Sequence, residues 1–339
     1  MINFFLDLTN FFRYKAREKK NNIGFFCENR FIFEYLKPYI SKISTKRKVI
    51  IISFEKIENK ILPTDSCFVF RSNFFRELVF LTLKLNVLYS STPDIGNTIF
   101  KRSKLKKNCK YIYLQHSPVS LTMIYREKAF ENFDAIQVIS KFQESEINEM
   151  KTKNNFNIKV FRSKYLFVDK KKTNSKKTHD VLLAPTWNSN FFDLNCHKLL
   201  KEHMDKNNIS YILRPHPMSF KKKEISLEDL NKLNIPVDSS NNLDLNKYRF
   251  LVSDWSGIFI EYALLSNQKA FLINTPKKIK NKNFQRYENK PIEITMRDKF
   301  GHIYEVNNIE ILVKDILSLK EQKLNEDESL KKLIKDNFF

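Results

Sequence analysis

Glycine is scarce in this chain of 339 residues, occurring only at Gly24, Gly96, Gly257 and Gly301. The glycine-rich loops that hold dinucleotides or phosphates, of the GxGxxG and GxxxxGK[ST] types, need several glycines within a few residues. Four glycines spread this far apart can form neither loop. The sequence therefore excludes the commonest nucleotide-binding signatures.

Cysteine is equally rare, and its four positions, Cys27, Cys67, Cys109 and Cys196, form no CxxC pair. No histidine lies at zinc-finger spacing from a cysteine. Widely spaced single thiols are typical of buried or idle cysteines in a reducing compartment. We therefore expect no bound metal and no cofactor.

A secretory leader and a long apolar run are also missing. The N-terminal stretch places its positive charges after its apolar residues, the reverse of a secretory signal, and Asp7 interrupts it. The longest apolar stretch, residues 78–89, is broken by Lys84 and Asn86 and is too short to span a bilayer. These features predict a cytoplasmic protein.

Acidic residues are outnumbered, with 38 Asp+Glu against 60 Lys+Arg, and the formal net charge is +22. The basic residues form short runs at 101–110, 170–177, 221–223 and 277–282, between apolar segments. No nucleic-acid-binding signature accompanies them, so we expect no nucleic-acid partner. An anionic inner membrane leaflet is a better partner, since each basic residue near it contributes about 1 kcal/mol. A genomic base composition that favours Lys and Asn is the plainer explanation for part of the excess of basic residues.

Short apolar strands alternate with amphipathic, helix-length segments through both halves of the chain. The expected strands are 49–53, 67–71, 87–91, 111–115, 135–139 and 158–161, then 180–185, 211–214, 250–253, 270–273 and 302–306. Expected helices include 120–130, 141–150, 193–206 and 258–266. Continuous apolar strands are typical of parallel sheets covered by helices on both faces. The pattern predicts an α/β fold of two Rossmann-like, doubly wound domains facing a cleft.

We place the N-terminal, acceptor-side domain at residues 1–169 and the nucleotide-donor-binding domain at 179–308. The polar stretch 170–178 is the expected linker. Residues 309–339 are expected to form one or two charged helices that cross back onto the first domain. Ligands of such sheets bind outside the carboxyl ends of the strands, so functional residues are sought there.

Two histidines follow predicted strands, His116 in the first half and His216 in the second. His216 lies between two prolines, with Arg214 two residues earlier. Arginine offers a permanent charge and a fork of donors to phosphate oxygens, and histidine is the usual proton carrier near neutral pH. Either histidine, taken alone, is also explained as a turn residue.

Another strand end, 250–257, turns directly into an apolar helix and carries Ser253, Asp254, Ser256 and Gly257. Free N–H groups at such a helix start can hold a phosphate or diphosphate. A helix cap is the plain structural alternative.

The order of four motifs resembles the CDP-glycerol glycerophosphotransferases of teichoic-acid and capsule synthesis. The motifs are His116-Ser-Pro118, Pro185-Thr186-Trp187, Arg214-Pro-His-Pro217 and Ser253–Tyr262, the last with Glu261 at its acidic position. The chain departs from the family pattern at Ser117, where glycine is usual, and at Trp255 and Gly257, where tyrosine and serine are commoner. These departures leave the donor open.

The resemblance implies a GT-B-like fold and transfer of a glycerol-phosphate-type unit from a CDP-alcohol to a hydroxyl of a surface polymer, with release of CMP. It implies that His116 is the base and that His216 stabilises the donor diphosphate. The donor-binding residues are expected to be Thr186, Arg214, Ser253, Asp254, Ser256, Gly257 and Glu261.

The expected partners are a nucleotide-activated donor, a glycan or lipid-linked acceptor, and the inner membrane face, where the protein would be peripheral. A GT-B glycosyltransferase that uses a nucleotide sugar is the alternative. A basic binding module for nucleic acid or membrane is a third hypothesis, but it leaves the histidines at strand ends unexplained.

Overall fold

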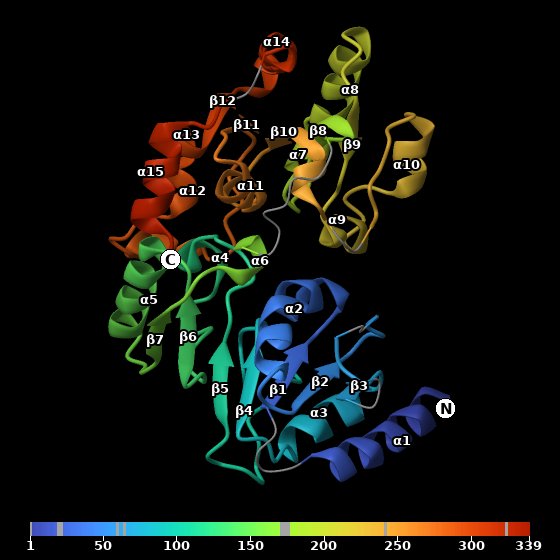
Figure 1. Ribbon diagram of the computed structural model, residues 1–339, viewed down its shortest axis with the longest axis vertical. Helices are drawn as coiled ribbons and strands as arrows, with labels where there is room; N and C mark the ends of the chain where they lie inside the picture. Colours follow the sequence, from blue (N-terminus) through green and yellow to red (C-terminus); the bar gives the residue numbers. More distant parts are fainter. Residues whose placement is uncertain are drawn as a thin grey trace.

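Two parallel β-sheets lie one above the other, each covered by helices (Figure 1). The computed structural model describes residues 2–18, 23–58, 61–63, 66–169, 177–240, 243–322 and 325–339. The predicted class, an α/β fold with two Rossmann-like sheets, is confirmed.

The first half forms a sheet in the order β3-β2-β1-β4-β5-β6-β7, in which every pair is parallel. Its strands are β1 (Ile23–Cys27), β2 (Val49–Ser53), β3 (Cys67–Val69), β4 (Val87–Ser90), β5 (Lys110–Tyr113), β6 (Ala135–Val138) and β7 (Lys159–Arg162). Its helices are α1 (Ile2–Arg17), α2 (Arg30–Ser44), α3 (Asn73–Leu81), α4 (Leu121–Ile124), α5 (Lys141–Lys153) and α6 (Leu166–Asp169). Strands such as β2, whose five residues are all buried, account for the continuous apolar runs of the sequence.

The second half forms a sheet in the order β12-β11-β10-β8-β9, again parallel throughout. Its strands are β8 (His179–Leu183), β9 (Tyr211–Leu213), β10 (Tyr248–Ser253), β11 (Ala270–Ile273) and β12 (Gly301–Tyr304). Its α-helices are α7 (Asn190–Asp193), α8 (Cys196–Lys206), α9 (Pro217–Lys221), α10 (Leu227–Lys232), α11 (Ile258–Ser266), α12 (Ile292–Thr295), α13 (Arg297–Phe300), α14 (Ile309–Lys320) and α15 (Glu328–Asn337). The 3-10 helices are η2 (Leu245–Lys247), η3 (Lys282–Arg286) and η4 (Val306–Asn308).

Two features of the first half differ from expectation. The central strand β1 was not predicted, although it pairs with both β2 and β4. The helix expected over 120–130 is only the short α4, because Tyr125 adopts an extended backbone (φ −103, ψ 149) that ends it. Of the expected linker, residues 170–176 lie outside the described residues, and the domain boundaries stay a prediction.

The end of the chain returns to the first half, as expected, through the two residues that follow α15. The backbone N–H of Phe339 donates to the carbonyl of Ile139 at 3.1 Å, and Phe338 forms an antiparallel bridge with Ser140. The C-terminus accordingly lies beside α5 (Figure 1). Helix α14 instead packs against α8 in the second half.

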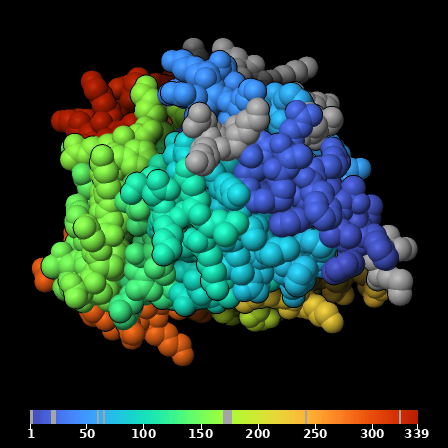
Figure 2. Space-filling model, turned by 90° about the horizontal axis from the view of Figure 1, so that it is seen from below, coloured from blue at the N-terminus to red at the C-terminus, as the bar shows by residue number. Residues whose placement is uncertain are grey.

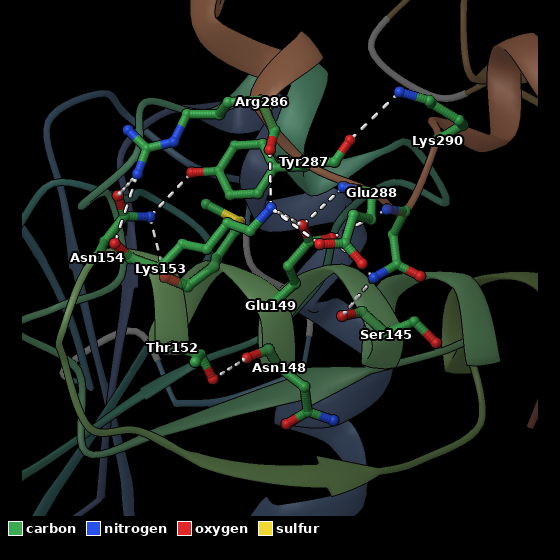
Figure 3. Close-up of polar contacts among 12 residues, drawn as sticks. Ser145, Asn148, Glu149, Thr152, Lys153, Asn154, Arg286, Tyr287, Glu288 and Lys290 are labelled. Carbon is green, nitrogen blue, oxygen red and sulfur yellow. Dashed lines mark hydrogen bonds and ion pairs between the residues drawn. The ribbon is translucent and has the colours of Figure 1, made fainter.

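A second connection between the halves runs through residues 286–290, which lie along α5 (Figure 3). The Glu149 carboxylate accepts backbone hydrogen bonds from Glu288 and Asn289, at 2.6 and 3.0 Å. The Lys153 ammonium donates to the carbonyl of Arg286 at 2.8 Å. These contacts hold the segment after β11 against the first half. None of the helices in the described ranges is both long and apolar enough to traverse a bilayer.

Candidate active site

A cleft of about 190 Å³ lies between the two halves, where the carboxyl ends of strands from both sheets converge. The first half contributes the start of α2 and the loop after β5, and the second half contributes the loops after β8, β9, β10 and β11. Of the predicted site residues, the cleft wall includes His116, Arg214, His216, Ser256, Gly257 and Glu261. Residues from the two halves of the sequence therefore meet at one site.

His116 follows β5, and its ring packs edge-on against Tyr35 of α2, with ring centroids 6.0 Å apart. Its backbone carbonyl lies 2.9 Å from the Tyr165 hydroxyl oxygen. Among the described residues, its buried Nδ1 atom has no hydrogen-bond partner. Burial, helped by the positive charge of Lys280, lowers the pKa of His116 from 6.5 to about 4. The imidazole is therefore neutral at pH 7 and able to accept a proton.

His216 forms the N-cap of α9, where its Nδ1 atom accepts a hydrogen bond of 3.1 Å from the N–H of Met218. Burial, followed by repulsion from Lys278 and Lys280, lowers its pKa from 6.5 to about 3. Because Nδ1 is an acceptor, a neutral His216 carries its proton on Nε2. It can thus donate a hydrogen bond to an anion, but it carries no charge at neutral pH.

Three lysines surround Trp187, after β8, and none of them was predicted as a site residue. The ammonium groups of Lys280, Lys222 and Lys278 lie 3.8, 4.4 and 4.8 Å from the Trp187 ring centroid. Lys278 and Lys280 line the cleft and come from the loop after β11. The basic run 277–282 was the sequence signal for them, but it was interpreted only as loop charge.

Burial and like charges make these two lysines unusually weak bases. The pKa of Lys278 is lowered from 10.5 to about 7, first by burial and then by Lys280. Burial and Lys222 lower the pKa of Lys280 to about 8. An anionic ligand would relieve this repulsion and favour the protonated ammonium groups. The cleft is thus electrostatically suited to phosphate.

Helix α11 begins at the cleft, and Gly257 lets it approach the loop that carries His116. A Cβ atom at Gly257 would lie 2.4 Å from Val119 Cγ1 and 2.8 Å from Ser117 Oγ. Both contacts are too close for any side chain at this position. The absence of a side chain therefore places the start of α11, with Ser256, directly across from the His116 loop.

Three predicted donor-binding residues, Thr186, Ser253 and Asp254, lie behind the cleft wall and do not line it. The Ser253 hydroxyl donates to the carbonyl of Ala184 at 2.7 Å. The Asp254 carboxylate accepts a hydrogen bond of 2.7 Å from the N–H of Thr186, and burial raises its pKa. These side chains are buried because they face the joined ends of β8 and β10. They support the cleft wall from behind. Lys278 also contacts this wall, because its ammonium group donates a hydrogen bond of 2.8 Å to Thr186 Oγ1.

Arg214 and Glu261 line the cleft but have protein partners. The Arg214 guanidinium pairs with Asp238 at 2.6 Å. Glu261, 2% exposed, accepts a hydrogen bond of 2.7 Å from Tyr165, and the Tyr35 hydroxyl lies 3.5 Å from it. A carboxylate is a poor ligand for a diphosphate, so Glu261 is better explained as a link between the halves.

No protein-family model matches the chain, and no curated protein does so by sequence. Solved structures do match over most of its length. The wall teichoic acid polymerase TagF, a histidine-to-asparagine variant soaked with CDPG, matches with TM-score 0.57 and 14% identity over 99% of this chain and 92% of that chain. UDP-N-acetylglucosamine 2-epimerase from Rickettsia bellii matches with TM-score 0.55 and 12% identity, over 93% and 95% of the two chains. A glycosyltransferase from Rickettsia africae matches with TM-score 0.50 and 12% identity, over 94% of both.

The two parallel sheets, the cleft between them and these similarities define the class of fold. The chain has the GT-B fold.

Proposed function

We propose that this protein is a transferase that moves a glycerol-phosphate-type unit from a CDP-alcohol to a hydroxyl of a cell-surface polymer and releases CMP. The observation that carries the proposal is the convergence of His116 and His216 with Lys278 and Lys280 in one cleft. This set combines a neutral base with donors and charges for phosphate, from opposite halves of the molecule.

In the proposed reaction, the acceptor oxygen attacks the phosphorus that bears the alcohol. The bond from that phosphorus to the bridging oxygen breaks, and CMP leaves with the bonding electrons. His116, whose ring is neutral at pH 7, takes the proton of the acceptor hydroxyl. The first half would therefore hold the acceptor.

The second half would hold the donor. The Nε2–H of His216, the ammonium groups of Lys278 and Lys280, and the start of α11 at Ser256 and Gly257 all border the cleft. Donors fixed in this way stabilise charge that develops on the transferring and leaving phosphates, which supplies most of phosphoryl-transfer catalysis. Among the predicted residues, Arg214 would act at the edge of this group, and Thr186, Ser253 and Asp254 would position it.

The choice of a CDP-alcohol is supported by the four sequence motifs and by the presence of TagF with CDPG among the structures of the same fold. The same fold also occurs in a glycosyltransferase and in UDP-N-acetylglucosamine 2-epimerase. A glycosyltransferase that uses a nucleotide sugar is therefore the second candidate. We further propose that the protein works in the cytoplasm at the anionic inner leaflet, on a glycan or lipid-linked acceptor.

Thermal melting with CDP, CMP, UDP, GDP and CDP-glycerol tests the nucleotide first. A ligand at one hundred times its dissociation constant adds about 2.7 kcal/mol of stability, which gives a clear rise in melting temperature. We expect cytidine nucleotides to stabilise the protein selectively and CDP-glycerol to yield CMP when an acceptor is present. A rise with UDP alone, with release of UDP from a nucleotide sugar, would replace the proposal by the second candidate.

His116→Gln tests the chemistry separately from binding. We expect this variant to bind CDP as the wild type does but to release CMP at least about 100-fold more slowly. His203→Gln, on α8 and outside the cleft, is the matched control and should be fully active. Full turnover by His116→Gln would remove His116 as the base.

A further inference from the structure

A row of large apolar side chains is exposed on α1 and the neighbouring α3. We call it the aromatic face, made up of Phe4, Phe5, Leu6 and Phe12 of α1 and Phe74 of α3. Phe12 is 66% exposed and Phe74 is 61% exposed. The rings of Phe4 and Phe74 lie 6.2 Å apart, so the two helices share one surface. Contiguous exposed apolar surface, unlike single scattered apolar residues, marks interaction sites.

The opposite side of α1 is firmly packed, which fixes the aromatic face outward. Tyr14 is fully buried in the core of the first half, and Leu8 and Phe11 pack against it. The buried Asp7 carboxylate accepts backbone hydrogen bonds from Arg71 at 2.8 Å and from Ser72 at 2.6 Å. These contacts attach α1 to the start of α3. Figure 2 shows α1 in dark blue on the surface of this end of the molecule.

The charge that α1 carries at its surface has one sign, and Glu77 of α3 is paired with Lys101 at 2.7 Å. Asp7 is the only acidic residue of α1, and it is buried, whereas Arg13 and Arg17 are exposed. Arg17 also borders a surface depression that it shares with three exposed basic residues between α2 and β2, namely Lys46, Arg47 and Lys48. Exposed aromatic rings beside a basic cluster are the combination by which surface helices bind anionic lipid.

We propose that the aromatic face docks on an anionic phospholipid bilayer, with its phenyl rings at the boundary of headgroups and acyl chains and the basic cluster at the lipid phosphates. A second copy of the chain is a poorer occupant, because symmetric pairing through this face would bring the basic residues of the two copies together. The inference assigns a surface to the membrane partner proposed above. The proposed docking does not depend on the identity of the nucleotide donor, since vesicle binding requires no turnover.

Vesicle co-sedimentation of the full chain tests this surface. We expect binding to vesicles of phosphatidylcholine with phosphatidylglycerol, and much weaker binding to phosphatidylcholine alone. The double variant Phe5→Ser and Phe12→Ser should bind at least about tenfold more weakly, because each ring buries apolar area in the bilayer. Leu227→Ser with Ile311→Ser removes two exposed apolar residues from α10 and α14 and should bind as the wild type does.

Wild-type binding by the Phe5, Phe12 double variant, with an unchanged melting temperature, would overturn the proposal. So would a concentration-dependent dimer that this variant abolishes while vesicle binding persists. Phe12→Trp gives a second measurement that needs no loss of binding. Its fluorescence should be quenched by brominated acyl chains beyond the quenching of wild-type Trp187 and Trp255, and an unchanged signal would contradict the docking.

The proposed transferase activity is a separate readout. With a water-soluble acceptor, CMP release by the Phe5, Phe12 double variant should equal that of the wild type. Loss of vesicle binding with normal release would therefore leave the proposed function intact. Normal vesicle binding in a protein that releases no CMP would reject only the function.

Discussion

Tyr165, just before α6, donates a hydrogen bond of 2.7 Å to the buried carboxylate of Glu261 on α11. The same hydroxyl lies 2.9 Å from the carbonyl of His116. One side chain thus contacts the proposed base loop of the first half and the helix that begins at the donor side of the cleft. This contact therefore contributes to the alignment of the two halves.

Removing either partner should destabilise the protein, and the two effects should not add. Tyr165→Phe leaves a buried carboxylate with fewer donors, which costs about 1–3 kcal/mol of unfolding free energy. Glu261→Gln should cost a similar amount. Urea unfolding of both variants and of their combination should give a coupling energy of about 1 kcal/mol or more. Additive effects would mean that the hydrogen bond contributes nothing of its own.

Gly257→Ala should reduce turnover by separating the start of α11 from the His116 loop. The added Cβ would lie 2.4 Å from Val119 Cγ1 and 2.8 Å from Ser117 Oγ, so these side chains, or the loop that carries them, must shift. A displacement of this order commonly costs about 100-fold in rate when it misplaces reacting groups. Val119→Ala removes the contacted methyl group, and the double variant should recover part of the activity. CMP release measures both effects, and a fully active Gly257→Ala protein would contradict the close approach.

The sheets were largely predictable, because all eleven expected strands follow from apolar runs and correspond to β2 through β12. The strand-end positions of His116 and His216 follow from the same runs. β1 (Ile23–Cys27) was missed because its second residue is a glycine and polar stretches flank it on both sides. Its burial in the centre of the sheet is set by tertiary pairing alone. The shortening of α4 likewise depends on the backbone of Tyr125 and on no local composition.

The position of the site could be predicted from the sequence, but only some of the residues that line it could. Sequence order brings Ser253 and Asp254 to a strand end, but it does not reveal that their side chains turn into the protein toward Ala184 and Thr186. Lys278 and Lys280 could not be distinguished from other lysines of their run, because only the approach of Trp187 from another loop makes them part of the cleft.

Lys278 and Lys280 should be required for nucleotide binding, whereas the exposed Lys282 of the same loop should not. Lys278→Met and Lys280→Met should each abolish most of the thermal stabilisation by the bound nucleotide, and Lys282→Met should retain it. The pKa values of about 7 and 8 imply that a diphosphate, by favouring the ammonium forms, causes proton uptake at pH 8. Titration calorimetry in buffers of different ionisation enthalpy measures this uptake. Binding without uptake would contradict these shifts.

Two buried carboxyl groups should make the protein less stable as the pH rises. Burial raises the pKa of Glu293 to about 7 and that of Glu146 to about 8. Between their unfolded values near 4.5 and these folded values, the native state binds more protons than the unfolded state. Stability present below pH 4.5 is therefore lost as the pH rises towards 8. The lowered pKa values of His116 and His216 act in the opposite direction up to about pH 6.5, so the wild type is compared with Glu293→Gln by urea unfolding. The unfolding free energy of the wild type minus that of the variant should fall between pH 4.5 and 7, and a constant difference would refute the assignment.

The pH dependence of transfer should reveal a base that is already neutral well below pH 6. The free enzyme's kcat/KM reports the pKa values of its essential groups. With the pKa of His116 near 4, the acid limb should begin near pH 4, and activity should stay flat from pH 5 to 6.5. Loss of the ammonium form of Lys278, whose pKa is near 7, should produce a fall on the alkaline side. His203→Gln should reproduce the wild-type profile, while Lys278→Met should lower activity and move the alkaline limb up towards the pKa of Lys280, near 8. An acid limb with a midpoint near 6.5 in the wild type would contradict the lowered pKa of the reacting base.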